Sequence, residues 1–168
     1  MNKYEPVVAS ALAAIPKAIV INGSRHGVAV LMKDGTIVQG FNIESRGFDN
    51  IHGEVVAIII ALNLGYRKND FEGMVITCEG RSVVPGCATC RQFMWEHTNP
   101  DMIIVAFDTT TANAEIYKLR DLYPLPYPSE KKPVPKPEVV AKKVDKIVKS
   151  KDVKIEDKES VKDGKKKA

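Results

Sequence analysis

The chain has 168 residues, of which 44% are hydrophobic, and this content suffices for one domain with a real core. No run of about 18 apolar residues without a charge occurs, so no transmembrane helix is indicated. The first twenty residues lack the basic start and the long apolar segment of a signal peptide, so we expect a cytoplasmic protein.

Charge is unevenly distributed along the chain. From Pro128 onward, fourteen lysines and eight acidic residues give a net charge of +6, whereas residues 1–127 carry −2. Five prolines between Pro124 and Pro135 mark the change, and prolines at this density exclude helix and sheet interiors. The tail has no aromatic residue and too little apolar surface to offset chain entropy. We therefore predict a catalytic domain over residues 1–127 and a disordered Pro/Lys-rich tail over 128–168, whose alternative role is a weak nucleic-acid contact.

Apolar patterns and turn residues divide the first 127 residues into alternating elements. An alanine-rich helix over about residues 5–15 ends near Pro16. Two apolar runs around Lys33-Asp34-Gly35 predict a β-hairpin. The remaining predicted elements are a helix from about Gly53 to Leu64, a strand over 74–78, a helix over 87–97, and strands over 102–107 and 114–119.

The connection between the last two strands predicts how they pair. It has about seven residues, beginning at Asp108, whereas a parallel crossover needs a dozen or more. Neighbouring strands joined this way should be antiparallel. The fold class that we predict is α/β, with a mixed sheet of about five strands and helices packed on it.

The helix that begins at Gly53 is apolar nearly all round, from Val55 to Leu64. A helix of this kind is buried on more than one side. A domain of about 127 residues has little material to cover both sides, so we expect a second subunit to cover part of it and the protein to be a homo-oligomer.

The three cysteines, Cys78, Cys87 and Cys90, are too few for a disulfide scaffold. Cys78 ends an apolar strand and is read as an inert core residue. Cys87 and Cys90 form a C-x-x-C motif, which points to metal or redox chemistry.

A metal site follows from where these cysteines lie. Cys87 and Cys90 are one turn apart at the start of a helix, where free N–H groups and the helix dipole stabilise thiolates. His52 lies at the start of the other helix, and the three side chains suit a zinc ion with an open fourth position. Glu54 would point about 200° from His52 on a regular helix, so it is read as a neighbour of the open position.

Other interpretations of the same residues remain. The C-x-x-C could be a redox pair, or it could belong to a closed structural zinc site that recruits His97, although the Cys90-to-His97 spacing is unusual for one. Taken alone, His26 and His97 are read as surface or satisfied polar residues.

The motifs together resemble a known family. His52-Gly53-Glu54 followed by the segment 85–92, PGCATCRQ, is similar to the H-x-E and P-C-x-x-C signature of zinc-dependent cytidine deaminases. GFNIES at residues 40–45 and LRDLYPLPY at 119–127 are similar to the ribose-binding and closing segments of the nucleoside branch. The resemblance covers about residues 5–127.

The resemblance implies a hydrolase of pyrimidine salvage that deaminates cytidine and deoxycytidine to uridine and deoxyuridine. It implies a nucleoside substrate, a Zn²⁺ cofactor, and a homo-oligomer, with a tetramer favoured over a dimer. The family pattern assigns His52, Cys87 and Cys90 to zinc, Glu54 to proton transfer, Asn42 and Glu44 to the sugar hydroxyls, and the backbone around Gly53 to the base.

The chain departs from the family pattern at four points. His52 replaces the cysteine of Cys-Ala-Glu-Arg, and Val55 replaces its arginine. The two changes agree, because three thiolates on Zn²⁺ leave a charge of −1 for an arginine to offset, whereas one histidine and two thiolates are neutral. Gly86 separates the proline from the first cysteine. Ser24 stands about where the family has an aromatic residue that stacks on the base.

Two alternative functions follow from these departures. One is a nucleoside deaminase similar to blasticidin S deaminase, which the segment EGRSVV at residues 79–84 resembles loosely. The other is a non-catalytic deaminase fold with an RNA-associated basic tail.

Overall fold

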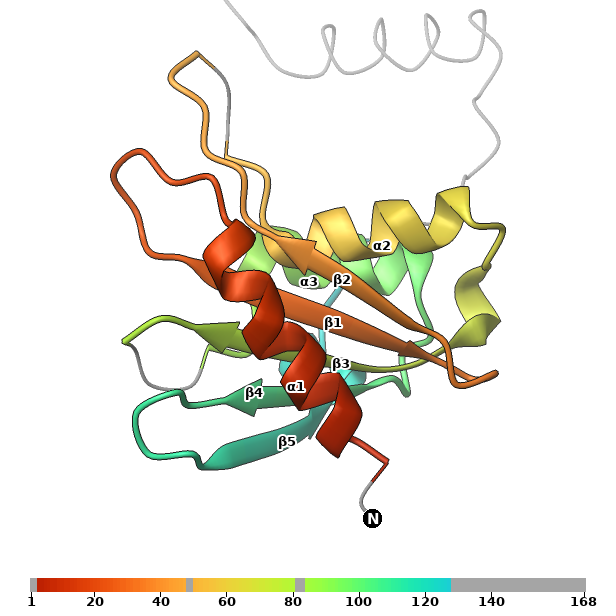
Figure 1. Ribbon diagram of the computed structural model, residues 1–168. Coiled ribbons are helices and arrows are strands. Elements are labelled where there is room, and N and C mark those ends of the chain that lie inside the picture. The colour runs from red at the N-terminus through yellow and green to blue at the C-terminus, as the bar shows by residue number, and fades with distance from the viewer. Residues whose placement is uncertain (1–2, 48–49, 81–83, 128–168) are drawn as a thin grey trace, which may run out of the picture. The chain divides into compact units, whose positions relative to one another are not determined.

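The computed structural model describes residues 3–47, 50–80 and 84–127. These residues form one five-stranded sheet in the order β2-β1-β3-β4-β5, with helices on both faces (Figure 1). The predicted tail over 128–168 lies outside the described residues. The helices are α1 (Glu5–Ala14), α2 (Gly53–Asn63), α3 (Ala88–His97) and α4 (Leu119–Leu122), and the strands are β1 (His26–Met32), β2 (Ile37–Phe41), β3 (Phe71–Cys78), β4 (Ile103–Phe107) and β5 (Ala114–Lys118).

The sheet is mixed, as the short final connection predicts. β1 is antiparallel to both β2 and β3, whereas β3 and β4 are parallel and are joined through α3. β4 and β5 are antiparallel, which confirms the prediction for the last two strands. The sequence did not indicate the short helix α4, which begins directly after β5.

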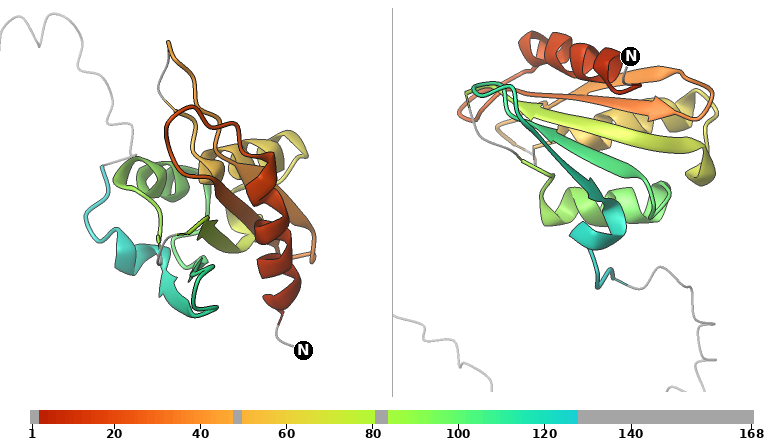
Figure 2. Two further views of the ribbon diagram at one scale, coloured as in Figure 1. Left: turned by 60° about the vertical axis from the view of Figure 1, so that its left-hand side comes forward. Right: turned by 90° about the horizontal axis from the view of Figure 1, so that it is seen from below.

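Helices cover the two faces of the sheet, with α1 on one side and α2 and α3 on the other (Figure 2). Val7 and Ala11 of α1 pack against Ala29, Val75 and Val105 of the sheet. On the opposite face, the core is larger and contains residues of α2 and α3. β1 is buried on both faces along most of its length, which explains its nearly continuous apolar sequence.

Helix α2 is buried on one side only within the single chain. Ala57, Ile58 and Ala61 are fully buried, whereas Ile59 and Ile60 remain 43% and 39% exposed. The described residues therefore do not give α2 the all-round burial that its composition suggests. Among the described residues, no helix combines the length and the hydropathy that crossing a bilayer requires.

A glycine sets the distance between α2 and the sheet. A Cβ atom on Gly40 of β2 would lie 2.2 Å from the carbonyl oxygen of Gly53 and 2.7 Å from the amide nitrogen of Ala57. No side chain fits such a gap, so the first turn of α2 rests directly on the β2 backbone. This contact fixes the N-terminus of α2, where His52 and Glu54 lie.

Candidate active site

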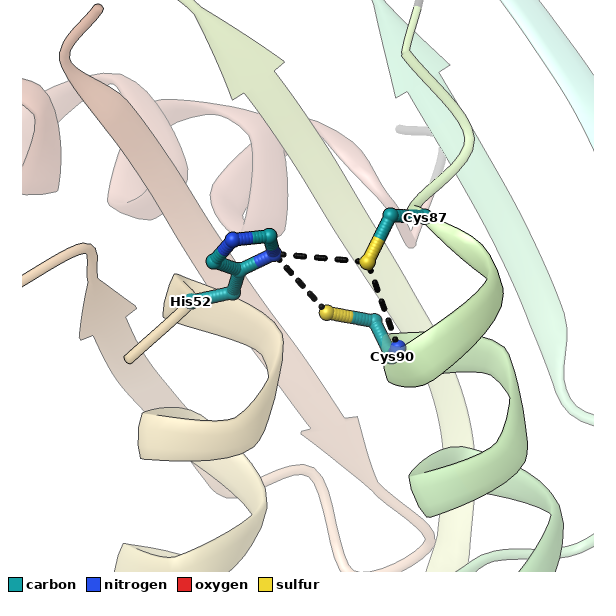
Figure 3. Close-up of side chains that lie close together, drawn as sticks. All are labelled: His52, Cys87 and Cys90. Atoms are coloured by element: carbon teal, nitrogen blue, oxygen red, sulfur yellow. Dashed lines mark hydrogen bonds between the residues drawn. The ribbon is translucent and has the colours of Figure 1, made fainter. Parts of the chain in front are cut away.

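Three side chains meet where α2 and α3 begin. The Nδ1 atom of His52 lies 3.4 Å from the Cys87 Sγ and 3.2 Å from the Cys90 Sγ (Figure 3). All the candidate ligand atoms of these residues lie within 4.8 Å of one another. Among the described residues, this is the group of histidine, cysteine and acidic side chains that could hold a metal ion.

Backbone geometry at the N-termini of α2 and α3 explains why these three side chains lie together. His52 and Cys87 are the N-caps of α2 and α3, and both have an extended backbone with φ near −79° and −78°. The Cys87 Sγ accepts a hydrogen bond from the Cys90 N–H at 3.4 Å. Cys87 therefore precedes the helix, whereas the sequence suggested that both cysteines lie within it. A cap position keeps the sulfur beside the free N–H groups of the first turn.

The donor set fits zinc. Tetrahedral zinc with ordinary bond lengths places nitrogen and sulfur ligands about 3.6 Å apart, close to the two separations between His52 and the cysteines. An N–H on His52 Nδ1 would have to be shared between the two sulfurs and would leave them facing each other, whereas a cation attracts all three ligands. Burial, followed by the neighbouring Glu54 carboxylate, raises the pKa of the Cys90 thiol. A thiolate at this buried position therefore needs a cation beside it.

Glu54 lines the same cavity as His52 and Cys87. Its side chain is only 5% exposed, although it carries an ionisable group. It lines a cavity of about 260 Å³ together with His52 and Cys87. A Cβ atom on Gly86 would lie 3.2 Å from Glu54 Oε1, and Gly86 has a φ of +83°. The extra glycine before Cys87 thus allows both a left-handed turn and a close approach to Glu54.

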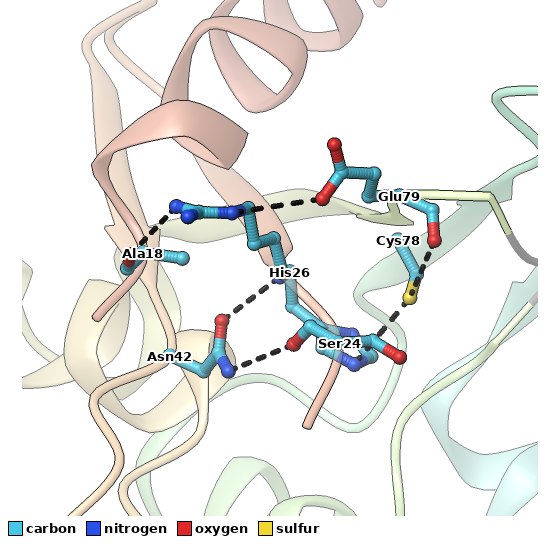
Figure 4. A network of polar contacts seen from close by, with 7 residues as sticks. Ala18, Ser24, His26, Asn42, Cys78 and Glu79 are labelled. Carbon is cyan, nitrogen blue, oxygen red and sulfur yellow. Dashed lines mark hydrogen bonds and ion pairs between the residues drawn. The ribbon is translucent and has the colours of Figure 1, made fainter. Parts of the chain in front are cut away.

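Asn42 and Glu44 line the other end of this cavity. The buried Asn42 accepts a hydrogen bond from the His26 N–H at 2.8 Å and donates one to the Ser24 carbonyl at 3.0 Å (Figure 4). The oxygen and the nitrogen of the Asn42 amide therefore both hold the backbone where it enters β1.

Glu44 holds the loop before β1 through backbone contacts. Its Oε2 accepts hydrogen bonds from the N–H groups of Ile21, Asn22 and Gly23 at 2.6, 2.9 and 3.2 Å. These bonds lower the pKa of Glu44, because they stabilise its charged form. The sequence suggested a sugar contact for Glu44 but not this second, structural task.

His26 is a cavity residue that sequence reasoning missed. It was read as a surface or satisfied polar residue, yet it lines the cavity together with Ser24 and Asn42. Its position is the first of β1, and it pairs with Cys78 of β3. The available signal was its spacing of two from Ser24, since alternate residues of an extended chain share a face.

The structure separates His97 from the metal-ligand candidates. His97 is the last residue of α3, and its ring packs on Phe93 with the centroids 4.4 Å apart. This arrangement does not support the closed structural site. Cys78 is 1% exposed, in agreement with its reading as a core residue. The segment EGRSVV includes residues 81–83, which lie outside the described residues.

A larger hollow of about 1010 Å³ adjoins the cavity and shares His52 with it. Apolar side chains such as Val55 and Phe93 line it, together with Gln92 and Tyr123. Gln92 Oε1 accepts hydrogen bonds from the Tyr123 hydroxyl and the Tyr127 N–H, both at 2.9 Å. Gln92 therefore ties the segment after α4 to α3.

Comparison with known proteins agrees with this geometry. Residues 1–106 match the family model of the cytidine and deoxycytidylate deaminase zinc-binding region. A cytidine deaminase of Halalkalibacterium halodurans is 39% identical over 72 residues, which are 42% of this chain and 52% of that protein. A cytidine deaminase of Sporosarcina psychrophila is 32% identical over 77 residues, 45% of this chain and 55% of that protein. The chain thus spans about half the length of these curated relatives.

Solved structures share the fold over a longer stretch. The crystal structure of cytidine deaminase from Burkholderia pseudomallei superposes with a TM-score of 0.70 at 25% identity, covering 74% of this chain and 98% of that one. Cytidine deaminase from Mycobacterium tuberculosis superposes with a TM-score of 0.63 at 23% identity, covering 74% and 97%. The second likeness concerns the fold alone.

Proposed function

The chain belongs to the cytidine and deoxycytidylate deaminase family, and we propose that it hydrolyses cytidine and deoxycytidine to uridine and deoxyuridine with release of ammonia. The observation that carries this proposal is the meeting of His52, Cys87 and Cys90 beside the buried carboxylate of Glu54. Metal ligands and a proton-transfer group in one cavity are what hydrolysis of a C–N bond at neutral pH requires.

The three ligands would hold one zinc ion. Zinc at such a site supplies Lewis acidity, which makes water a stronger acid at neutral pH. His52 contributes a neutral nitrogen, and the two thiolates balance the charge of the ion. The site then needs no arginine at position 55, where the chain has Val55.

Glu54 would move the protons. Its carboxylate would take a proton from water and deliver it to N3 of the pyrimidine. The hydroxide left by that water would add to C4. As the bond from C4 to the amino group breaks, Glu54 would take the remaining proton of the added hydroxyl and pass it to the leaving nitrogen, which departs as ammonia, while the oxygen stays on C4 as the product carbonyl. The burial of Glu54 supports this role, because a carboxylate shielded from bulk solvent exchanges protons with groups held in the cavity.

Asn42 and Glu44 would hold the sugar, and the backbone at Gly53 would meet the base. Glu44 Oε2 binds the loop before β1, so a sugar hydroxyl would contact the carboxylate's second oxygen. A negative group fixed by three N–H donors is a rigid acceptor for a hydroxyl.

An absorbance assay tests the proposed function. Purified protein loaded with zinc should convert cytidine to uridine, with loss of the cytidine absorbance and equimolar ammonia. Deoxycytidine and blasticidin S should be tested beside it, because they separate the proposed function from the related nucleoside deaminase. Absence of cytidine and deoxycytidine deamination by zinc-loaded, folded protein would refute the proposal, and deamination of blasticidin S alone would favour the related nucleoside deaminase.

Assembly, cellular role and location complete the proposal. We expect a homo-oligomer, because Ile59 and Ile60 of α2 and its C-cap residue Leu64 are exposed. The family resemblance favours a tetramer over a dimer. Light scattering at micromolar concentration measures this, and a monomer would contradict it. A role in pyrimidine salvage in the cytoplasm is consistent with a nucleoside substrate.

A further inference from the structure

The cavity has an unusual wall for a site that would hold a pyrimidine. Among the described residues that line it, there is no phenylalanine, tyrosine or tryptophan. The aromatic rings there are the imidazoles of His26 and His52. The Nδ1 of His52 is directed at the two cysteine sulfurs, so His52 belongs to the metal end. His26 is left as the ring that can face a base.

We propose that His26 is a specificity-determining residue whose imidazole ring forms the aromatic wall against which the pyrimidine packs. This inference rests on the proposed function, because it assigns a contact to the same substrate. A flat imidazole offers a π-face to a base, and base–aromatic contact does not require a particular hydrogen-bond pattern. His26 would thus take over the contact that Ser24 cannot make.

The residues that line the cavity together with His26 support this assignment. The backbone N–H of His26 is bound by Asn42, one of the two residues proposed for the sugar. The same cavity ends at His52 and Cys87, where C4 of the pyrimidine would lie. A pyrimidine ring connects C4 to the sugar, so it would lie within this cavity, whose wall includes His26.

The surroundings of His26 hold its ring in place. Its Nε2 lies 3.5 Å from the Cys78 Sγ, on the neighbouring strand (Figure 4). The carbonyl of Cys78 accepts a hydrogen bond from the Thr109 hydroxyl at 2.9 Å, which fixes this end of β3. A ring with restricted motion loses little freedom when a ligand packs on it.

Two substitutions distinguish an aromatic wall from a polar contact. His26→Phe keeps a flat ring and should leave the cytidine KM within about three-fold of wild type. His26→Leu removes the ring but keeps apolar volume, and it should raise KM by roughly 5- to 150-fold, the range for loss of a base–aromatic contact. A smaller change in kcat is expected, because the lost contact acts on substrate and transition state alike.

Binding is measured separately from turnover. Calorimetry with cytidine in a Glu54→Gln background should give the same ranking in Kd. Zinc content and thermal unfolding of each variant show whether the site and the fold are intact. His97→Leu is the matched control, since His97 packs on Phe93 outside the cavity. If His26→Leu does not fold, His26→Ala replaces it in the comparison with His26→Phe.

The outcomes separate this inference from the proposed function. If wild-type protein binds cytidine without deaminating it, and His26→Leu weakens binding, the inference stands and the function does not. If wild type deaminates cytidine and His26→Leu leaves KM and Kd unchanged, the inference is wrong. It is equally wrong if His26→Gln preserves binding and His26→Phe loses it, because the contact is then a hydrogen bond. Failure of the wild type to bind cytidine overturns both.

Discussion

The two ends of the cavity are built by different means. At the metal end, His52, Cys87 and Cys90 converge as side chains from two helix N-termini. At the sugar end, Asn42 and Glu44 use much of their hydrogen-bonding capacity on the protein's own backbone. A change at the metal end should therefore act through the bound metal or the proton-transfer group, whereas a change at the sugar end should disturb substrate binding and local structure together.

The largest effect is expected from loss of a metal ligand. Cys87→Ser or Cys90→Ser should reduce zinc from one ion per chain toward none and reduce deamination to the assay background. Stability should fall as well, because the free energy of metal binding also supports the fold. Metal analysis and thermal unfolding check this prediction.

Cys78→Ser is the matched control for these variants. Cys78 is buried outside the metal-ligand group, so its replacement should leave zinc content unchanged. Two zinc ions per chain, or loss of zinc from the Cys78 variant, would show that the ligands are assigned wrongly.

Replacement of Glu54 should separate chemistry from metal binding. Glu54→Gln keeps the shape of the side chain and leaves His52, Cys87 and Cys90 in place, so zinc should remain. Deamination should slow by on the order of 10² to 10⁴, since positioned acid–base groups contribute about that much. The measurement is kcat on cytidine with zinc determined in the same sample. Turnover near that of wild type would rule out the proposed mechanism.

At the sugar end, Glu44→Gln should have a smaller and mixed effect. Loss of a charge-assisted hydrogen bond to a sugar hydroxyl lowers kcat/KM by roughly 10- to 150-fold. Free cytosine, which lacks the sugar, should be affected far less if it is a substrate at all. Equal losses on cytidine and cytosine would place Glu44 in structure alone.

The loop contacts of Glu44 add a pH dependence to this variant. Hydrogen bonds from the backbone hold the folded-state pKa of Glu44 below its usual value of 4.5. Glu44 therefore stabilises the fold fully above that value, and this contribution disappears as the pH falls through the folded-state pKa. Wild type and Glu44→Gln should accordingly converge in thermal stability in acid.

Two glycines of similar backbone conformation allow a finer test of the metal end. Gly86 and Gly35 have φ values of +83° and +89°, so alanine at either should cost about 1–2 kcal/mol of stability. A Cβ on Gly86 meets Glu54 Oε1 at 3.2 Å, whereas one on Gly35 has nothing within 4 Å. Gly86→Ala should therefore lower kcat several-fold, and Gly35→Ala should not. Equal activities would mean that Gly86 serves the turn only.

Much of the fold was predictable, because its signals are local. The hairpin turn at Lys33-Asp34-Gly35, the apolar periodicity and the short connection after Asp108 led to the mixed sheet with antiparallel last strands, as found. The exposed face of α2 was less predictable. The composition of a helix shows how apolar its surface is, but it does not show how much of that surface the rest of the chain buries.

Predictability differed between the two ends of the site as well. Candidate metal ligands can be recognised from their spacing in the sequence, and the structure brings His52, Cys87 and Cys90 together. The wall formed by His26 was not recognised, because its place depends on which cavity the start of β1 faces. The bonds from Glu44 to the loop at residues 21–23 use backbone N–H groups, and these carry no signature in the sequence.

The smallest effect is expected from removal of the tail. A chain that ends at Tyr127 keeps both ends of the cavity and the contacts of Gln92 with Tyr123 and Tyr127. From the composition after Tyr127 we predict that the tail adds nothing to the core. Deamination of cytidine by the truncated chain should therefore stay within about two-fold of that by the full chain, and the two thermal transitions should coincide. If the tail contacts RNA, the full chain alone should bind it, and affinity should fall steeply with salt, since the lysines displace counterions. Loss of folded protein on truncation would instead place the end of the domain beyond Tyr127.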